Sequence, residues 1–282
     1  DSLNARVLLV DPATEIVTPF SPRTNSGPNL LFAPAGIAID PDGAIFVADS
    51  FADRIVRIDP VTGVQSVVPD FSAQLGDFGP SDVGTAPQGI DVEDSVTGLD
   101  RRDLFVASAD GLYRVSRSSD ATFTAPLSNA ADVLLGTDVS VQENLGEPYS
   151  LWVVANGVLV RWYFENGATQ ALTESDARNV RGVEYALDTP LYTRNVCYAA
   201  TSLNGLFVYE GSFGGTQLEG DGFAACLGRP LAAASPTLLY GTYGDADVVA
   251  LVPEIGGYAS EIVATLPEAD VPPVAADLAV SP

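Results

Sequence analysis

Three aspartates in one long polar segment have the residue type and the clustering that could bind a metal ion. The segment, residues 70–82, reads DFSAQLGDFGPSD and contains Asp70, Asp77 and Asp82. Carboxylate oxygens are the ligands that Ca²⁺ prefers, although these three do not follow the alternating spacing of an EF-hand loop. The sequence leaves two alternatives for this segment: a calcium site, or an ordered connecting loop that binds no ion.

The chain contains no histidine, and this removes several kinds of catalytic site. It has 37 acidic and 13 basic residues, every basic residue is arginine, and the formal net charge is −24. Histidine general acid–base catalysis, Ser–His and Cys–His nucleophiles and histidine metal ligands are therefore excluded. The negative charge argues against nucleic-acid binding. We also expect no membrane insertion, since no apolar run reaches the roughly 20 residues that span a bilayer.

Two cysteines, Cys197 and Cys226, do not have the spacing of a metal site. We expect a disulfide between them, and the alternative is two buried free thiols. Asp1 is not a usual translation start and no signal peptide follows it. The expectation is therefore a mature protein that is secreted, either extracellular or periplasmic.

The elements that would position these residues are predicted best from residues 34–68. Four short apolar runs at 36–40, 45–48, 54–58 and 65–68 alternate with turn residues such as Asp42-Gly43 and Thr62-Gly63. Glycine and aspartate allow the backbone conformations of tight hairpins. The pattern predicts a four-stranded antiparallel meander, which cannot bury both of its faces alone and therefore requires further copies.

The copies follow along the chain, with one repeat for every 48 residues or so. Each copy is recognised by four apolar runs. The second copy is expected at 88–93, 103–108, 111–116 and near 123–127, and the third at 138–142, 150–155, 158–163 and 168–172. The fourth is expected at 182–186, 196–201, 205–209 and near 216–218, and the fifth near 231–234 and at 237–242, 247–252 and 260–265. The tryptophans and the tyrosine beside them, Trp152, Trp162 and Tyr163, are expected to pack between copies. The alternative is an exposed aromatic patch that binds a sugar or peptide.

The two ends of the chain complete a sixth copy between them. Residues 1–20 align without a gap with residues 49–68, and residues 276–282 align with residues 35–41. Radial repetition of four-stranded sheets is the arrangement of a β-propeller. We predict an all-β fold, a six-bladed β-propeller with four-stranded antiparallel blades. It would form a single domain over 1–282, and its last blade would be shared by the two termini.

The motif PAGIAIDPDGAIFVADSFADRIVRID at residues 34–59 resembles the NHL-type repeat. The likeness is strong over 34–68, good over 1–12 and 86–115, and weak in the third to fifth copies. It implies a propeller more firmly than an activity, because such scaffolds carry binders and enzymes alike. In that family the positions of Asp49, Asp53 and Arg54 make structural contacts between strands and turns, so we interpret them as scaffold residues.

Related six-bladed propellers include enzymes, and the resemblance allows each type to be weighed. Amidating and antibiotic-ring lyases use histidine near the central channel, which this chain lacks. Gluconolactonase-like hydrolases hold calcium in the channel with residues that often stand just before the first-strand glycine. The equivalent positions here contain no carboxylate or asparagine; they are Ala35, Gln88, Thr137, Arg181, Pro230 and Ala276. Arg178 and Arg181, with Gln88, are the candidates for contact with an anionic ligand near the channel.

Two functions remain open at this point. The first is a non-catalytic extracellular propeller, a binding or scaffold module for a protein or small ligand. The alternative is a divalent-cation-dependent hydrolase of the gluconolactonase-like type, with calcium as its cofactor. Comparison with the complete repeat also shows that the shared blade has no counterpart of residues 42–48, its second strand. That strand would come either from residues beyond one terminus or from another chain by strand donation.

Overall fold

In the computed structural model, the regular secondary structure of the described residues is almost entirely β-strand. The structure describes residues 1, 3–21, 27–68, 86–92, 103–109, 111–117, 122–126, 136–144, 147–164, 169–172, 180–186, 196–201, 205–210, 215–217, 219–220, 227–235, 238–243, 247–254, 257–266 and 279. Within these residues no helix is long and apolar enough to cross a membrane. The α-helical content of the described part is nil, and a single 3₁₀ turn covers Ser50–Ala52.

Five antiparallel sheets of at least four strands follow one another along the chain. Blade 1 is made of β3 (Pro34–Ile39), β4 (Ile45–Asp49), β5 (Arg54–Ile58) and β6 (Gln65–Val67). Blade 2 is made of β7 (Pro87–Val92), β8 (Leu104–Ser108), β9 (Gly111–Arg117) and β10 (Thr122–Pro126). Blade 3 is made of β11 (Gly136–Asn144), β12 (Glu147–Ala155), β13 (Val158–Tyr163) and β14 (Thr169–Leu172). Blade 4 is made of β15 (Val180–Ala186), β16 (Val196–Thr201), β17 (Gly205–Glu210) and β18 (Gly215–Gln217). Blade 5 is made of β20 (Leu227–Ser235), β21 (Leu238–Tyr243), β22 (Asp247–Glu254) and β23 (Gly257–Thr265).

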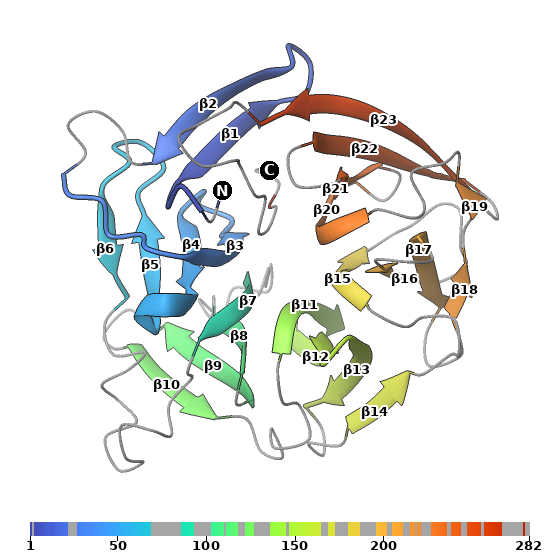
Figure 1. The fold of residues 1–282 in the computed structure, drawn as a ribbon. Coiled ribbons are helices and arrows are strands. Elements are labelled where there is room, and N and C mark those ends of the chain that lie inside the picture. Colours follow the sequence, from blue (N-terminus) through green and yellow to red (C-terminus); the bar gives the residue numbers. More distant parts are fainter. Residues whose placement is uncertain are drawn as a thin grey trace.

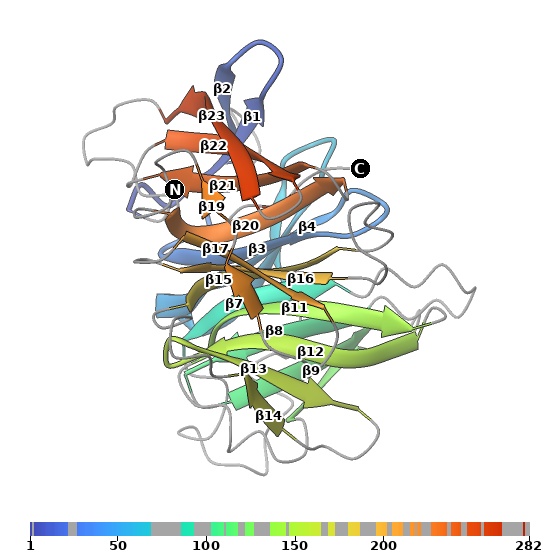
Figure 2. The same cartoon turned by 90° about the vertical axis from the view of Figure 1, so that its right-hand side faces the viewer.

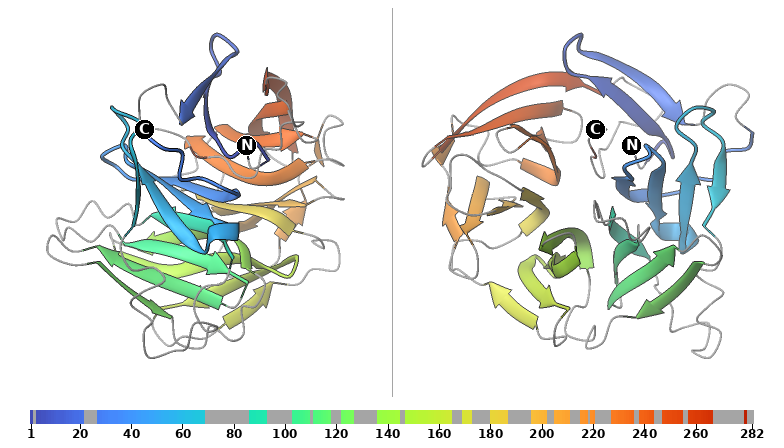
Figure 3. Two further views of the ribbon diagram at one scale, coloured as in Figure 1. Left: turned by 60° about the vertical axis from the view of Figure 1, so that its left-hand side comes forward. Right: turned by 180° about the vertical axis from the view of Figure 1, so that it is seen from behind.

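The sixth sheet has two described strands, β1 (Val7–Asp11) and β2 (Ile16–Ser21), and we call it the partial blade. The six sheets stand in a ring, with β3, β7, β11, β15 and β20 innermost (Figure 1). The view from behind places the partial blade between blades 5 and 1 (Figure 3). A side view also places β1 and β2 beside β22 and β23 (Figure 2). The predicted all-β propeller is therefore confirmed.

Neighbouring blades pack through alternating strand residues, and these interfaces form the core. Between blades 1 and 2 the cluster includes Phe46 and Ile55 on one side and Ile90 and Val106 on the other. Because successive side chains of a strand point to opposite faces, each blade contributes one apolar set to each neighbour. The central strands are consequently buried on both faces, as β4 is along its whole length.

The tryptophans of blade 3 pack between blades, as expected. Trp162 belongs to the cluster that joins blades 2 and 3. Trp152 is buried, and its ring lies 6.2 Å from the ring of Tyr209 in blade 4. Tyr163 is half-buried and stacks with the guanidinium of Arg161, 4.8 Å from its ring. These contacts match the packing interpretation for the two tryptophans.

Strand positions agree with the sequence prediction within a few residues, and three strands, β5, β13 and β16, agree at both ends. One element was not predicted: β19 (Glu219–Gly220) pairs in parallel with β23 and extends the sheet of blade 5. Two residues leave too short a run for an alternating pattern to be recognised. The expected first strand of the shared blade, 276–280, lies outside the described residues except for Ala279.

Candidate functional site

Each of blades 1 to 5 carries a β-bulge at the same place, where its innermost strand enters the ring. The register of β3 with β4 shifts between Pro34 and Gly36, so Ala35 has no partner in the ladder. The equivalent shifts in blades 2, 3 and 4 leave Gln88, Thr137 and Arg181 without a partner in the ladder. In blade 5 a longer bulge does the same for residues 228–230. Bulges often re-aim a side chain next to a functional site. The structure therefore places four of the predicted channel positions at equivalent points of the ring, and the longer bulge contains Pro230.

The inner strands of blades 1 and 2 approach each other closely at this level. A Cβ atom on Gly36 would lie 2.2 Å from the backbone oxygen of Gln88, which leaves no room for any side chain. Gln88 itself is half-buried. The glycine of the repeat is thus required by backbone proximity at the channel wall.

Several predicted site residues cannot be placed from the described part of the chain. Arg178, Asp70, Asp77 and Asp82 lie outside it, and so does Cys226. For Arg181 and Cys197 the structure describes only the backbone, within β15 and β16. Among the residues that the structure describes, no group of three or more His, Cys, Asp or Glu could hold a metal ion. The anion, calcium and disulfide sites stay predictions.

The polar residues of the repeat make scaffold contacts. Asp49 is fully buried and accepts hydrogen bonds from the backbone N–H groups of Phe32 and Ala33, at 3.2 and 2.7 Å. Its carboxylate also pairs with Arg54 Nε at 3.1 Å. Asp53 has a left-handed backbone, with φ of 48°, and accepts a hydrogen bond of 2.7 Å from the N–H of Ala86, which connects blade 1 to blade 2.

The sequence Asp40-Pro41-Asp42-Gly43 resembles a cation-binding sequence, but the carboxylate of Asp40 accepts hydrogen bonds from the turn's own backbone. Asp40 Oδ1 accepts hydrogen bonds of 3.0 Å from the N–H groups of Asp42 and Ala44. Gly43 has a φ of 80° and its N–H donates to the Asp40 carbonyl at 2.7 Å. The hairpin geometry therefore accounts for these residues without an ion.

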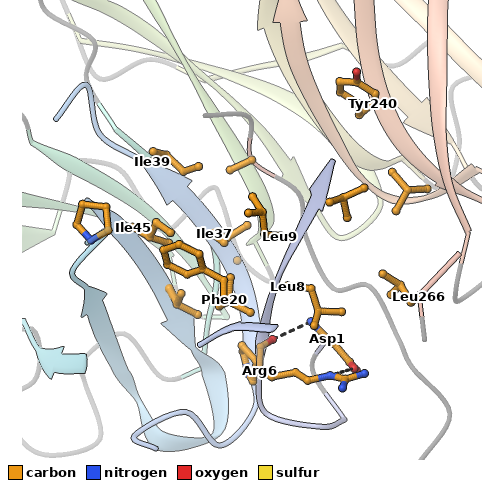
Figure 4. A pocket seen from close by; sticks show the side chains of 18 of the residues that line it. Asp1, Arg6, Leu8, Leu9, Phe20, Ile37, Ile39, Ile45, Tyr240 and Leu266 are labelled. Carbon is orange, nitrogen blue, oxygen red and sulfur yellow. Dashed lines mark hydrogen bonds and ion pairs between the residues drawn. The ribbon is translucent and has the colours of Figure 1, made fainter. Parts of the chain in front are cut away.

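A cavity of about 530 Å³ lies between the partial blade and blades 1 and 5. We call it the seam cavity (Figure 4). Its wall is formed by β1, β3, the first half of β4 and single residues of β21, β22 and β23. The lining residues are Asp1, Arg6, Val7, Leu8, Leu9, Val10, Pro12, Phe20, Pro34, Ala35, Gly36, Ile37, Ile39, Gly43, Ile45, Val47, Pro60, Tyr240, Val248, Val263, Leu266 and Ala279.

The wall of the seam cavity is apolar apart from one ion pair and one phenol. The charged residues, Asp1 and Arg6, are bound to each other, with Arg6 Nε 2.6 Å from Asp1 Oδ2. Asn4 Nδ2 also donates to both carboxylate oxygens, at 3.1 and 3.0 Å. Tyr240 supplies the phenol. Chemically, such a cavity can bind an apolar group but offers no nucleophile with an adjacent base.

The cavity wall on blade 1 is less buried than the equivalent wall on blade 2. Ile37 and Ile39 of β3 occupy the register positions of Ile90 and Val92 of β7. Ile90 and Val92 are 3% and 5% exposed because blade 1 covers them, whereas Ile37 and Ile39 are only half-buried. The face that blade 1 turns to the partial blade is therefore incompletely covered by the described residues.

The sequence interpretation identified the gap in the repeat but not the residues that surround it. One signal was available: Leu9 stands where the complete repeat has Arg57, so β1 reads as an unbroken apolar run from Val7 to Val10. Leu9 is 51% exposed and lines the seam cavity. The blade 5 residues that line the seam cavity could not be identified in this way, because they reach the cavity only when the ring of blades closes.

Comparison with known proteins places this chain among β-propellers. No family model matches the sequence. A gluconolactonase from Zymomonas mobilis is 34% identical over 85 residues, which covers 29% of this chain and 24% of that protein. The chain thus aligns with about a quarter of the length of this curated relative.

Two solved structures extend the likeness to nearly the whole chain. A chain of the nidogen–laminin complex superposes with a TM-score of 0.61 at 12% identity, over 88% of this chain and 90% of that one. A catalytically inactive histidine-to-alanine variant of virginiamycin B lyase from Staphylococcus aureus, solved with quinupristin, superposes with a TM-score of 0.54 at 16% identity. The match covers 88% of this chain and 74% of the lyase. At these identities the likeness shows the fold.

Proposed function

We propose that this propeller is a non-catalytic binding module and that the seam cavity is its binding site. The observation that supports this most directly is the composition of the cavity wall. It is apolar except for Tyr240 and for Asp1 and Arg6, which neutralise each other. A concave apolar site with few polar groups is typical of ligand recognition.

The residue types around the channel argue against the catalytic chemistry of the related propellers. The chain has no histidine, whereas the virginiamycin B lyase variant that lacks one histidine is catalytically inactive. At the bulges of the inner strands stand Ala35, Gln88, Thr137 and Arg181, none of which is a carboxylate. Calcium would find no anionic ligand at these four positions.

The second candidate is a divalent-cation-dependent hydrolase, and the local likeness to a gluconolactonase favours it. Its metal would have to come from residues other than the four bulged ones. Asp70, Asp77 and Asp82 are the carboxylates that the sequence offers for calcium.

One experiment distinguishes the two candidates. The purified protein is assayed on a panel of lactones and esters with added Ca²⁺ and with chelator, and its melting temperature is measured under the same conditions. We expect no turnover above the uncatalysed rate and no calcium-dependent rise in melting temperature, since a metal that binds only the folded state would raise it. Calcium-dependent turnover that the chelator removes would overturn the binding-module proposal.

If turnover were found, three substitutions would locate it. Arg181→Ala and Gln88→Ala change side chains at the channel bulges, whereas Asp77→Asn changes the 70–82 segment. Loss of turnover in the first pair alone would assign the activity to the channel, and loss in the third alone would assign it to the segment.

A further inference from the structure

Arg6, the residue just before β1, is paired with Asp1 on the inner side of the partial blade, and this pairing has the geometry of a β-ladder. The Arg6 N–H donates to the Asp1 carbonyl at 3.2 Å, and the Asp1 ammonium donates to the Arg6 carbonyl at 3.0 Å. Two residues that exchange both bonds form the hydrogen-bonded pair of an antiparallel ladder. Asp1 therefore occupies the place of one strand residue beside β1.

The alternation of a strand then defines the rest of that edge. Because backbone N–H and C=O groups point to the same side at every second residue, those of Leu8 and Val10 point to the same side as those of Arg6. On that side the described residues contain no strand paired with β1, whose ladder partner is β2 alone. A strand edge with N–H and C=O groups that no neighbouring strand pairs is a template for the addition of another strand.

Blade 1 shows which strand fits there. Its β4 pairs with β5 through Asp49 with Arg54, Val47 with Val56 and Ile45 with Ile58. Arg54, Val56 and Ile58 align with Arg6, Leu8 and Val10, and Asp49 aligns with Asp1. The ion pair is repeated as well, between Asp49 and Arg54 at 3.1 Å and between Asp1 and Arg6 at 2.6 Å. The seam cavity thus lies where a strand equivalent to β4 would run.

The walls of the seam cavity offer an apolar surface on both faces of such a strand. Ile37 and Ile39 line one side, and Leu266 lines the other (Figure 4). Val248 and Val263 of blade 5 also belong to the wall. The side chains of Leu8 and Val10 pack with the blade 5 residues, in the same cluster as Val248 and Leu266. A strand with alternating apolar residues would contact both neighbours, as the second strand of a complete blade does.

We propose that the seam cavity accepts an extended peptide strand, added antiparallel to β1 with its C-terminal end towards Asp1. The proposal rests on the binding-module function and names its partner class. The occupant is a segment of about four uncharged apolar residues, because the first four positions of β4 and β8, the equivalent strands of blades 1 and 2, are apolar and buried. The fifth position of β4 is Asp49, whose place Asp1 takes. A small apolar molecule would fill the volume but would leave the edge of β1 unpaired.

The test uses a peptide with the sequence of residues 42–48, DGAIFVA, carrying a polar fluorescent label at its amino end. Binding to the intact protein is measured by fluorescence anisotropy. We expect saturable binding, and binding at least tenfold weaker for a control peptide in which the residues that correspond to Ile45 and Val47 are aspartate. At a concentration of about 100 times its Kd, the peptide should raise the melting temperature by roughly 5 °C.

A fusion variant supplies the strand covalently. Adding DGAIFVA directly before Asp1 should raise the melting temperature by at least the same amount and abolish binding of the free peptide. Ile37→Lys places a charge in the seam cavity and should weaken peptide binding at least tenfold. Ile16→Lys, at a position that is 56% exposed on β2 and outside the cavity wall, is the matched control and should leave binding unchanged.

Each outcome decides the proposal. Absence of peptide binding together with an unchanged melting temperature of the fusion variant would overturn it. Self-association of the protein that the peptide abolishes would overturn the assignment to a peptide partner, since a second copy would then be the occupant. The binding-module function is tested separately and would be overturned by calcium-dependent turnover. If the protein showed neither turnover nor peptide binding, only the peptide proposal would be overturned.

Discussion

Blade 1 and the partial blade have nearly the same sequence pattern but differ in burial. In blade 1, β5 has one exposed residue, Arg57, whereas β1 of the partial blade is half-buried or exposed at every position after Val7. Both retain the buried carboxylate that pairs with an arginine. The alternating sequence pattern is therefore sufficient to form the hairpin. How deeply its strands are buried depends on the strands that lie on either side of it and not on the hairpin's own sequence.

The largest expected effect concerns the buried carboxylates. Asp49→Ala should lower the free energy of unfolding by about 3–5 kcal/mol, because it leaves Arg54 and two backbone N–H groups without their buried acceptor. Asp1→Ala, in the partial blade, should cost less, about 1–2 kcal/mol. Urea unfolding of both variants measures the difference. Equal costs would show that the partial blade is as tightly integrated as blade 1.

The matched isoleucines come next. Ile90→Ala removes a side chain that is 3% exposed and should cost about 3 kcal/mol. Ile37→Ala, at the same register position but half-buried, should cost about 1–2 kcal/mol. In the fusion variant with an added strand, the cost at position 37 should rise towards that at position 90. An unchanged cost there would contradict an added strand that covers blade 1.

The turn that follows the third strand differs between the two regions at one backbone position. Gly63 has a φ of 70°, and its counterpart in the partial blade is Glu15, with a φ of 59°. Non-glycine residues are disfavoured in the left-handed region by about 1 kcal/mol. Glu15→Gly should therefore raise the free energy of unfolding by up to about 1 kcal/mol and Gly63→Ala should lower it by a similar amount. Thermal unfolding of the two variants checks the opposite signs.

The smallest effect is the pH dependence of the same turns. Hydrogen bonds from the Thr62 backbone and hydroxyl hold the pKa of Asp59 below its ordinary value, and the Thr14 hydroxyl and the Ala13 N–H do so for Asp11. A carboxylate with a lowered folded-state pKa stabilises the fold above its unfolded pKa and loses this contribution as the pH falls through the folded value. The loss is expected below a pH of about 4.

Asp59→Asn and Asp11→Asn should each flatten the decline of stability below that pH, and by similar amounts, because both carboxylates are exposed and are bonded to turn residues at corresponding positions of the repeat. Urea midpoints between pH 2.5 and 6 measure this. A flattening in only one variant would show that the two turns differ in solution.

The amino-acid sequence by itself determined the repeat, the strands and the hairpin turns of this protein. These follow from local alternation and from residues such as Asp40 and Gly43, whose roles need only the chain nearby. It also revealed that residues 276–282 and 1–20 align, position by position, with the parts of the repeat on either side of β4, which leaves a gap between them. Tertiary structure alone decided where that gap opens. Leu8 of the partial blade, Ile37 of blade 1 and Leu266 of blade 5 all line the seam cavity, although Leu266 is more than 200 positions from the other two in the sequence. Their proximity depends on ring closure, which is set by packing between blades and not by any local pattern.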